Sequence, residues 1–116
     1  MNLYHCLIDL KSDAKALAFA SAIETWLTTL AAMGLIGQWR LLRRKLGLAT
    51  SSHSDFLLEI EVADLATLDA TFHALGHVDD AAQRHYEQLH HMIARAEIGL
   101  YRPFPDPEQR ERIALI

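Results

Sequence analysis

The sequence is short of the features that mark secreted, membrane and nucleic-acid-binding proteins. Cys6 is the only cysteine, so the chain can form no internal disulfide, which favours a reducing compartment. No apolar stretch approaches the ~20 residues that span a bilayer, and no basic segment followed by an apolar run opens the chain. The formal charge of -4 disfavours nucleic acid and acidic membranes as partners, because both require a basic surface. We therefore expect a cytoplasmic protein with neither kind of partner.

The apolar content is sufficient for one hydrophobic core. The chain has 116 residues, of which 51% are hydrophobic and 22% charged, as in single globular domains. No linker, repeat or low-complexity segment divides it. We expect one domain over residues 1–103 and a C-terminal tail over residues 104–116. The apolar end of that tail, Ile113, Leu115 and Ile116, predicts that it packs on the domain or on a partner subunit.

Alternating side chains predict strands with one apolar face and one polar face. The clearest strand is residues 55–62. Its apolar face consists of Phe56, Leu58, Ile60 and Val62, and its other face of Leu57, Glu59 and Glu61. Residues 3–10 follow the same pattern, and a last strand is expected over about residues 95–102, ended by Pro103.

The second strand, over residues 35–48, is ambiguous because neither of its faces is wholly apolar. Arg40 and Arg44 share one face, and Arg43 and Lys45 share the other. A bulge or a strand that extends beyond the core would explain the pattern. A helix is possible, but the glycines at both ends of the segment favour an extended hairpin arm.

Helical spacing of apolar residues predicts three helices. Ser12 or Asp13 would cap the first, and Gly34 would end it. Asp64 would cap the second, which Gly76 closes, and Val78 with Asp79 would begin the third. The expected buried stripes are Phe19, Ile23, Trp26, Leu27 and Leu30; then Leu65, Leu68, Phe72 and Leu75; then Ala82, Tyr86, Leu89 and Ile93.

This element order predicts an α+β, ferredoxin-like βαββαβ fold: an antiparallel sheet with helices on one face. The face away from the helices would carry His5, Asp9, Arg40, Arg44, Glu59, Glu61, Glu97 and Tyr101, or Arg43 and Lys45 in the other register. Leucines lie among these residues, so the face is too apolar for water and too charged for a dry core. Pairing with a second copy would resolve the conflict, because an isologous two-fold dimer lets one surface cover itself.

On four segments the chain resembles the dimeric α/β-barrel superfamily, and more closely an uncharacterised bacterial family of that kind. The segments are residues 3–10, 39–46, 56–62 and 99–104. The resemblance implies that two ferredoxin-like subunits pair their sheets into a barrel with a cavity between them. Relatives in the superfamily include cofactor-free monooxygenases, haem-degrading enzymes, lactone isomerases and stress-response proteins. None of their catalytic sets matches here, so no functional residue is carried over.

The eight residues of the polar face form the candidate pocket. His5 with Asp9 and Glu59 could form an acid–base group, or His5 could be a cavity histidine with a hydrogen-bond partner. The arginines could bind a carboxylate or phosphate, although pairing with Glu59, Glu61 and Glu97 across strands is the favoured interpretation.

Three further features have a chemical and a structural interpretation. Tyr101 could donate a proton to a substrate oxygen, or anchor the end of its strand. Cys6 lies on an apolar face, which favours an inert buried thiol. The histidine pairs, such as His73 with His77 and Glu87 with His91, lack a third ligand, so we expect no metal and no cofactor.

The leading hypothesis for function is a homodimer that binds a small, partly apolar, anionic molecule on the polar sheet face. The alternative is a small cofactor-independent monooxygenase or isomerase that uses His5 with Asp9, Glu59 or Tyr101. A third possibility is a structural or interaction module whose paired sheets are only its dimer interface.

Overall fold

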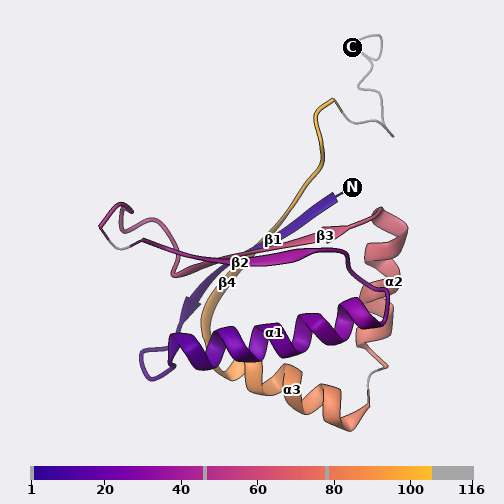
Figure 1. The fold of residues 1–116 in the computed structure, drawn as a ribbon, viewed down its shortest axis with the longest axis horizontal. Helices are drawn as coiled ribbons and strands as arrows, with labels where there is room; N and C mark the ends of the chain where they lie inside the picture. Colours follow the sequence, from indigo (N-terminus) through magenta and orange to yellow (C-terminus); the bar gives the residue numbers. More distant parts are fainter. Residues whose placement is uncertain (1, 46, 78, 106–116) are drawn as a thin grey trace.

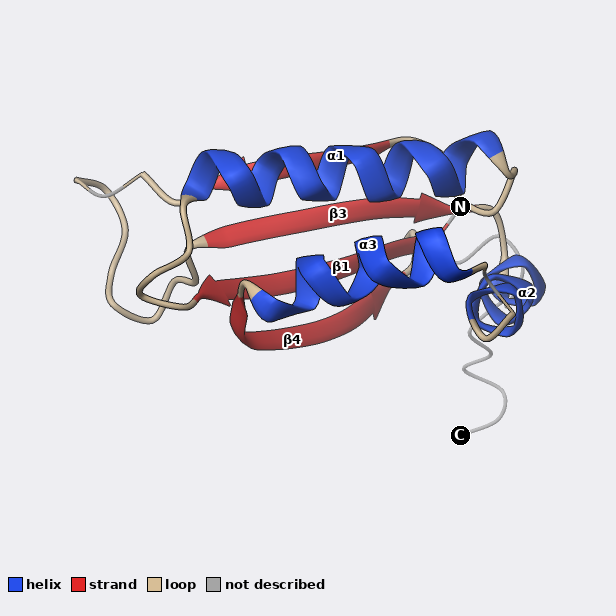
Figure 2. Cartoon of the chain, turned by 90° about the horizontal axis from the view of Figure 1, so that it is seen from below, coloured by secondary structure: helices blue, strands red, loops and turns tan. Residues whose placement is uncertain are grey.

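The described residues form one four-stranded antiparallel sheet, with two helices over one of its faces and a third across one end (Figures 1 and 2). The computed structural model describes residues 2–45, 47–77 and 79–105. In chain order the elements are β1 (Asn2–Leu10), α1 (Ala16–Ala32), β2 (Trp39–Arg43), β3 (Phe56–Val62), α2 (Leu65–Leu75), α3 (Asp80–His91) and β4 (Ile93–Tyr101). The strands lie in the order β2-β3-β1-β4. The predicted α+β, ferredoxin-like fold is therefore confirmed, including the predicted pair of helices between β3 and β4.

The core lies between the helices and the face of the sheet that we call the inner sheet face. On β3 the buried residues alternate with half-buried ones, as the sequence predicts. All five apolar residues expected on α1 are buried: Phe19, Ile23, Trp26, Leu27 and Leu30. Gly34 has a positive φ of 73°, which glycine adopts without strain, and the chain turns there after α1. The alternation of the strands and the stripe of α1 thus determine which sheet face is covered.

Two aspartates join the end of β1 to the start of β3. The Asp9 carboxylate accepts a hydrogen bond from the backbone N–H of Asp55, and the Asp55 carboxylate accepts one from the N–H of Leu10, both at 3.0 Å. Each carboxylate thereby accepts a hydrogen bond from a backbone N–H group at the end of the other strand. We call this pair of contacts the aspartate clasp.

The structure corrects the predicted limits of several elements. The first helix begins at Ala16, after Lys15, and has no side-chain cap; Ser12 and Asp13 lie in the preceding turn instead. The second strand covers only Trp39–Arg43, because residues farther along form an exposed loop. The third helix ends at His91, and Ile93 is the first residue of β4 rather than part of the helical stripe.

The predicted buried stripe of α2 is wrong. Leu65 and Phe72 are about half exposed, Leu68 and Leu75 are half-buried, and the buried residue is Thr71. The reason is the position of α2, which lies across one end of the sheet instead of over it (Figure 2). The Asp64 and Asp79 caps are confirmed by hydrogen bonds from the N–H groups of Thr67 and Ala82. The expected staple at Val78 and most of the expected tail, residues 106–116, lie outside the described residues.

The inner side of β4 is only partly covered. Ile98 is 63% exposed and Leu100 40%, although both lie on the inner sheet face opposite Cys6 and Tyr4. The helix layer therefore leaves an apolar opening beside β4. Within the described part of the chain, no helix has the length and apolar character needed to cross a membrane.

Candidate functional site

The face of the sheet away from the helices, here the outer sheet face, carries the predicted polar residues in rows across the strands. One row runs from Arg40 on β2 through Glu59 and His5 to Gly99 on β4. The next row is apolar over three strands and consists of Leu42, Leu57 and Leu7, with Glu97 at its end. The register thus confirms that polar and apolar residues share this face and settles that Arg40, rather than Arg43, lies on it.

His5 lies in a notch that Gly99 provides. A Cβ atom at Gly99 would be 2.4 Å from Cε1 of the His5 ring, so any other residue here would force the imidazole to shift. The ring of Tyr101 covers the other side, with ring centroids 4.7 Å apart. Nδ1 of His5 is buried and has no hydrogen-bond partner among the described residues. The structure therefore brings Tyr101 to His5, whereas the Asp9 carboxylate is engaged in the aspartate clasp.

The three arginines of the cationic segment make different contacts. Arg40 forms an ion pair with Glu59 across the strands, and this hydrogen bond raises the pKa of the guanidinium. Arg44 donates to the backbone oxygen of His53 and lies 3.8 Å from the Asp55 carboxylate. Arg43 lies on the inner side, with its guanidinium carbon 5.9 Å from the centre of the Phe56 ring.

The two remaining acidic residues of the candidate pocket are not gathered around His5. Glu97 pairs with Arg95 on its own strand, and Glu61 lies beside Gly37. Cross-strand ion pairing, the favoured interpretation of the arginines, is thus found for Arg40 with Glu59. An anionic ligand on this face stays a prediction.

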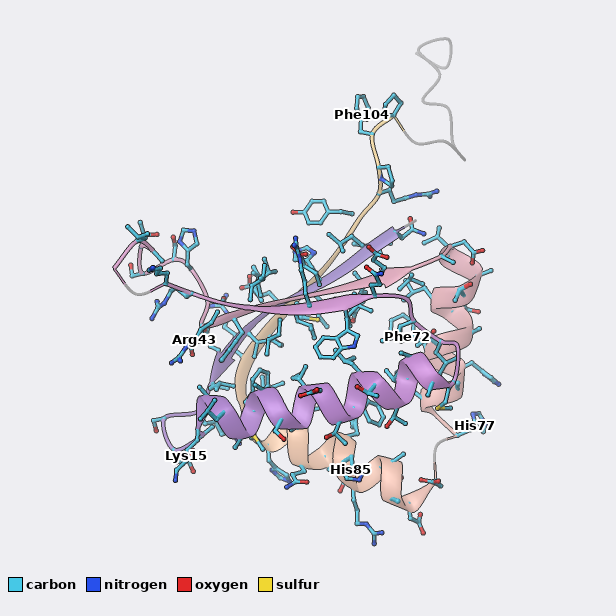
Figure 3. All side chains as sticks on the ribbon, viewed as in Figure 1. Lys15, Arg43, Phe72, His77, His85 and Phe104 are labelled. Carbon is cyan, nitrogen blue, oxygen red and sulfur yellow. The ribbon has the colours of Figure 1, made fainter. Side chains whose placement is uncertain are left out.

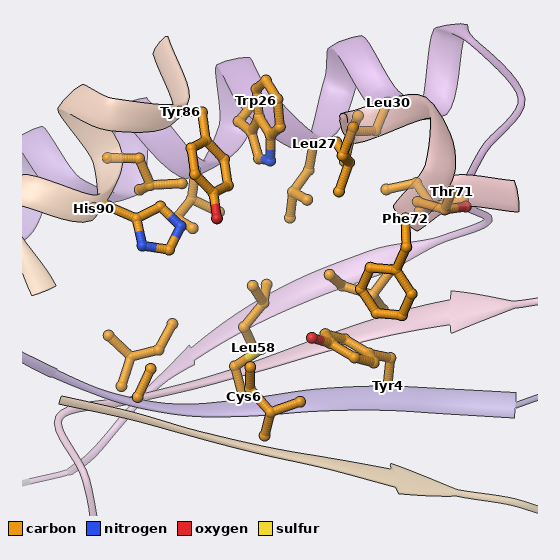
Figure 4. Close-up of a pocket in the computed structure, with 18 of the residues that line it drawn as sticks. Tyr4, Cys6, Trp26, Leu27, Leu30, Leu58, Thr71, Phe72, Tyr86 and His90 are labelled. Atoms are coloured by element: carbon orange, nitrogen blue, oxygen red, sulfur yellow. The ribbon is translucent and has the colours of Figure 1, made fainter. Parts of the chain in front are cut away.

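A cavity of about 610 Å³ lies on the opposite side of the sheet, between the inner sheet face and the three helices (Figure 4). We call it the helix-side cavity. Its lining is mainly aliphatic and aromatic, and includes Tyr4, Cys6, Trp26, Leu58, Phe72, Tyr86, His90 and Ile98. None of these was a predicted site residue, because all but His90 follow the apolar face of a strand or a helical stripe, a pattern typical of core residues. The only sign of a site that the sequence offered was the polar group at the end of the Tyr and Trp side chains.

Several polar atoms point into the helix-side cavity. These are the hydroxyls of Tyr4 and Tyr86 and the indole nitrogen of Trp26 (Figure 4). Within the described residues, none of the three forms a hydrogen bond with the protein. These donors are not sealed from water, since Tyr86 is 41% exposed, so they mark a place where a ligand or water can bind.

One wall of the cavity is a run of three rings in tilted contact. Trp26 contacts Tyr86 with ring centroids 5.5 Å apart, and Tyr86 contacts His90 at 4.1 Å. Burial lowers the pKa of His90, which favours the neutral imidazole. The same effect raises the pKa of Cys6 to about 11 and also raises that of Tyr4. These groups are therefore neutral at pH 7.

No Lys, Arg, Asp or Glu side chain is among the described residues that line the helix-side cavity. In that part of the chain there is also no group of three His, Cys, Asp or Glu side chains arranged to hold a metal ion. The chemistry that the cavity offers is thus hydrogen bonding by neutral donors in apolar surroundings.

Comparisons with known proteins agree with this architecture. A family model described as a family of unknown function (DUF6614) matches residues 1–116. No curated protein matches the sequence.

Solved structures with similar folds include a dimeric ferredoxin-like protein of unknown function from Jannaschia sp. CCS1. Its TM-score is 0.63 at 16% identity, with 89% of this chain and 100% of that chain covered. A dabb family protein with a ferredoxin-like fold from Mesorhizobium loti has a TM-score of 0.63 at 14% identity, covering 89% and 96%. A variant of SnoaB, a cofactor-independent oxygenase from Streptomyces nogalater, has a TM-score of 0.60 at 12% identity, covering 93% and 96%. At these identities the likeness establishes the fold, and the predicted resemblance to dimeric ferredoxin-like proteins is confirmed.

Proposed function

We infer the function of this chain, which belongs to the family of unknown function DUF6614 over its whole length, from its own geometry. We propose that it is a homodimer whose subunits each bind a small, neutral, mainly apolar molecule in the helix-side cavity. The observation that carries the proposal is the set of three donors, on Tyr4, Tyr86 and Trp26, that face an apolar cavity without a protein partner. The cavity volume, about 610 Å³, lies within the range of roughly 300–1,000 Å³ found for small-molecule sites.

The lining also indicates the charge of the ligand. An ionised group placed in an apolar cavity loses its hydration, and only a partner of opposite charge compensates that loss. The described lining offers no such partner, so a neutral molecule with carbonyl or hydroxyl oxygens fits best. The apolar opening beside Ile98 gives such a molecule a route of entry.

The test uses 1-naphthol and 1-naphthoate, two probes of nearly the same shape and different charge. We expect 1-naphthol to quench tryptophan fluorescence saturably, because Trp26 lines the cavity, and 1-naphthoate to bind at least tenfold more weakly. Tyr86→Phe removes one hydroxyl and should weaken 1-naphthol binding about 2- to 10-fold, the effect of one net hydrogen bond. Tyr101→Phe makes the same change on the outer sheet face and should leave binding unchanged. Lack of saturable binding, or equal effects of both variants, would contradict the proposal.

The composition of the outer sheet face supports the homodimer. Leu42, Leu57 and Leu7 form an apolar row on this face, and Leu42 is 40% exposed in the single chain. Charged residues of both signs flank the row, so one copy can complement another related by a two-fold axis. The Jannaschia protein, which shares the fold, is described as dimeric.

Sedimentation equilibrium tests the dimer and its interface together. We expect the wild-type chain to sediment as a dimer at micromolar concentration, and Leu57→Arg to sediment as a monomer because it puts a charge in the middle of the apolar row. Leu17→Arg is the matched control, since Leu17 is 86% exposed on α1 in the helix layer and should leave the dimer intact. A wild-type monomer, or a monomer produced by both variants, would exclude pairing through the outer sheet face.

Catalysis by His5 stays a prediction beside this proposal, and the contact between His5 and Tyr101 is the observation that favours it. In an enzyme that uses this pair, Tyr101→Phe would lower turnover of a substrate while 1-naphthol binding in the helix-side cavity is retained. A protein that binds no probe in either place would fit the interpretation as a structural module.

A further inference from the structure

A second, smaller cavity of about 280 Å³ lies at the end of the sheet where β1 finishes and α1 begins. Its walls come from three separate segments: the turn after β1, the end of β2 and the start of β3. The polar residues that line it are Lys11, Ser12, Arg43, Arg44 and Asp55. We call this cavity the basic recess. It shares no lining residue with the helix-side cavity.

The basic recess has a surplus of positive charge. Three of its side chains are cationic and one, Asp55, is anionic. Within the described residues neither Lys11 nor Arg43 has a carboxylate partner, since Arg43 contacts the Phe56 ring instead. Asp55 offsets one of the three positive charges, because its carboxylate lies 3.8 Å from Arg44. Among the residues that the structure describes, two cations thus line the recess without a paired carboxylate.

The N-terminus of α1 adds to the positive electrostatic potential of the basic recess. Ala14 and Ala16 line the recess, and Lys15 and Arg43 lie at the same end of the molecule (Figure 3). The Lys15 side chain, at the N-cap position, caps none of the helix N–H groups, and the first turn of α1 contains no acidic residue. The free N–H groups and the positive end of the helix dipole therefore reinforce the cations.

From this charge surplus we propose that the basic recess binds a phosphate group, either inorganic phosphate or the phosphoryl end of a larger molecule. Arg43 provides a planar set of donors that matches phosphate oxygens, and Lys11 provides a second positive charge from the opposite wall. The Ser12 hydroxyl is a third donor in the lining. The site is independent of the ligand in the helix-side cavity, so either can exist without the other.

Isothermal titration at constant ionic strength, set with chloride, tests the proposal with inorganic phosphate and phenyl phosphate. We expect saturable binding of at least one probe. Tighter binding of phenyl phosphate would identify a phosphoryl ester as the source, and equal binding would identify free phosphate. Arg43→Gln and Lys11→Gln should each weaken binding at least fivefold, whereas Arg84→Gln, on the exposed side of α3, should leave it unchanged.

A substitution at Lys15 separates a built site from general attraction to positive charge. Lys15→Asp supplies the missing cap of α1, so its carboxylate should occupy the helix N–H groups and weaken phosphate binding at least fivefold more than Lys15→Glu, which has the same charge but is a poor N-cap. No binding by the wild type beyond the chloride control would overturn the proposal. So would equal losses in Arg43→Gln and Arg84→Gln, because that pattern reports net charge alone.

Discussion

Replacing Gly99 with alanine should destabilise the protein, and the loss should depend on His5. The new Cβ would lie 2.4 Å from Cε1 of the His5 ring and 3.2 Å from both ring nitrogens. The Tyr101 ring lies against the imidazole, so a shift of the imidazole disturbs this ring contact as well. Overpacking of this kind typically costs about 1–3 kcal/mol, and the reduced entropy of the unfolded chain offsets about 0.4–1 kcal/mol.

The net loss is then about 1–2 kcal/mol, equivalent to a fall in Tm of roughly 4–8 °C for a chain of this size. Thermal unfolding followed by circular dichroism, at one fixed protein concentration, measures it. In a His5→Ala background the same glycine substitution should raise Tm, because the clash is gone and only the entropic gain is left. Gly47→Ala, whose Cβ would meet no atom within 4 Å, should not lower Tm in either background. An equal loss from Gly99→Ala with and without His5 would refute the reasoning.

Three further predictions concern groups held by hydrogen bonds or burial. Because burial raises the pKa of Cys6 to about 11, only about one thiol in a thousand is ionised at pH 8, and alkylation by iodoacetamide should be far slower in the folded protein than in urea. Asp9→Ala leaves the N–H of Asp55 without its acceptor and should lower the free energy of unfolding by about 1 kcal/mol in urea titrations, while an unchanged midpoint would show that the clasp contributes nothing. The N–H of Thr67 lowers the pKa of Asp64, so this cap stabilises the fold above the unfolded pKa of about 3.9 and is lost as pH falls through the folded pKa. Wild type should therefore lose more stability than Asp64→Asn in an acid titration.

The sequence was sufficient to predict the fold where one periodic pattern repeats over a whole element. In β3 and α1 every predicted inward residue is buried, because alternation and helical spacing are both set by burial on one side. The face of Arg40 could not be read from β2 itself, since both of its faces mix charges and leucines. Only the pairing of Arg40 with Glu59 on β3 determines which sheet face Arg40 lies on, and that register depends on residues far away in the chain.

The site was harder to predict than the fold for a physical reason. Tyr4, Trp26 and Tyr86 have the spacing of core residues, and their polar tips do not disclose whether the space beside them is filled. That depends on how far the helices stand from the sheet, which is a tertiary property. The misread stripe of α2 has the same origin, because the helix lies across the end of the sheet and leaves Phe72 exposed.

The aspartate clasp has a consequence for engineering. It anchors the chain immediately before β3, and Arg44 pairs its backbone N–H with the oxygen of Asp55 on the neighbouring side. The intervening loop, which includes the 84% exposed Leu48, is therefore held in place by hydrogen bonds at its ends. A short peptide epitope or a fluorophore-labelling tag inserted beside Leu48 should leave strand alignment intact, which makes this loop a suitable handle for immobilising the protein.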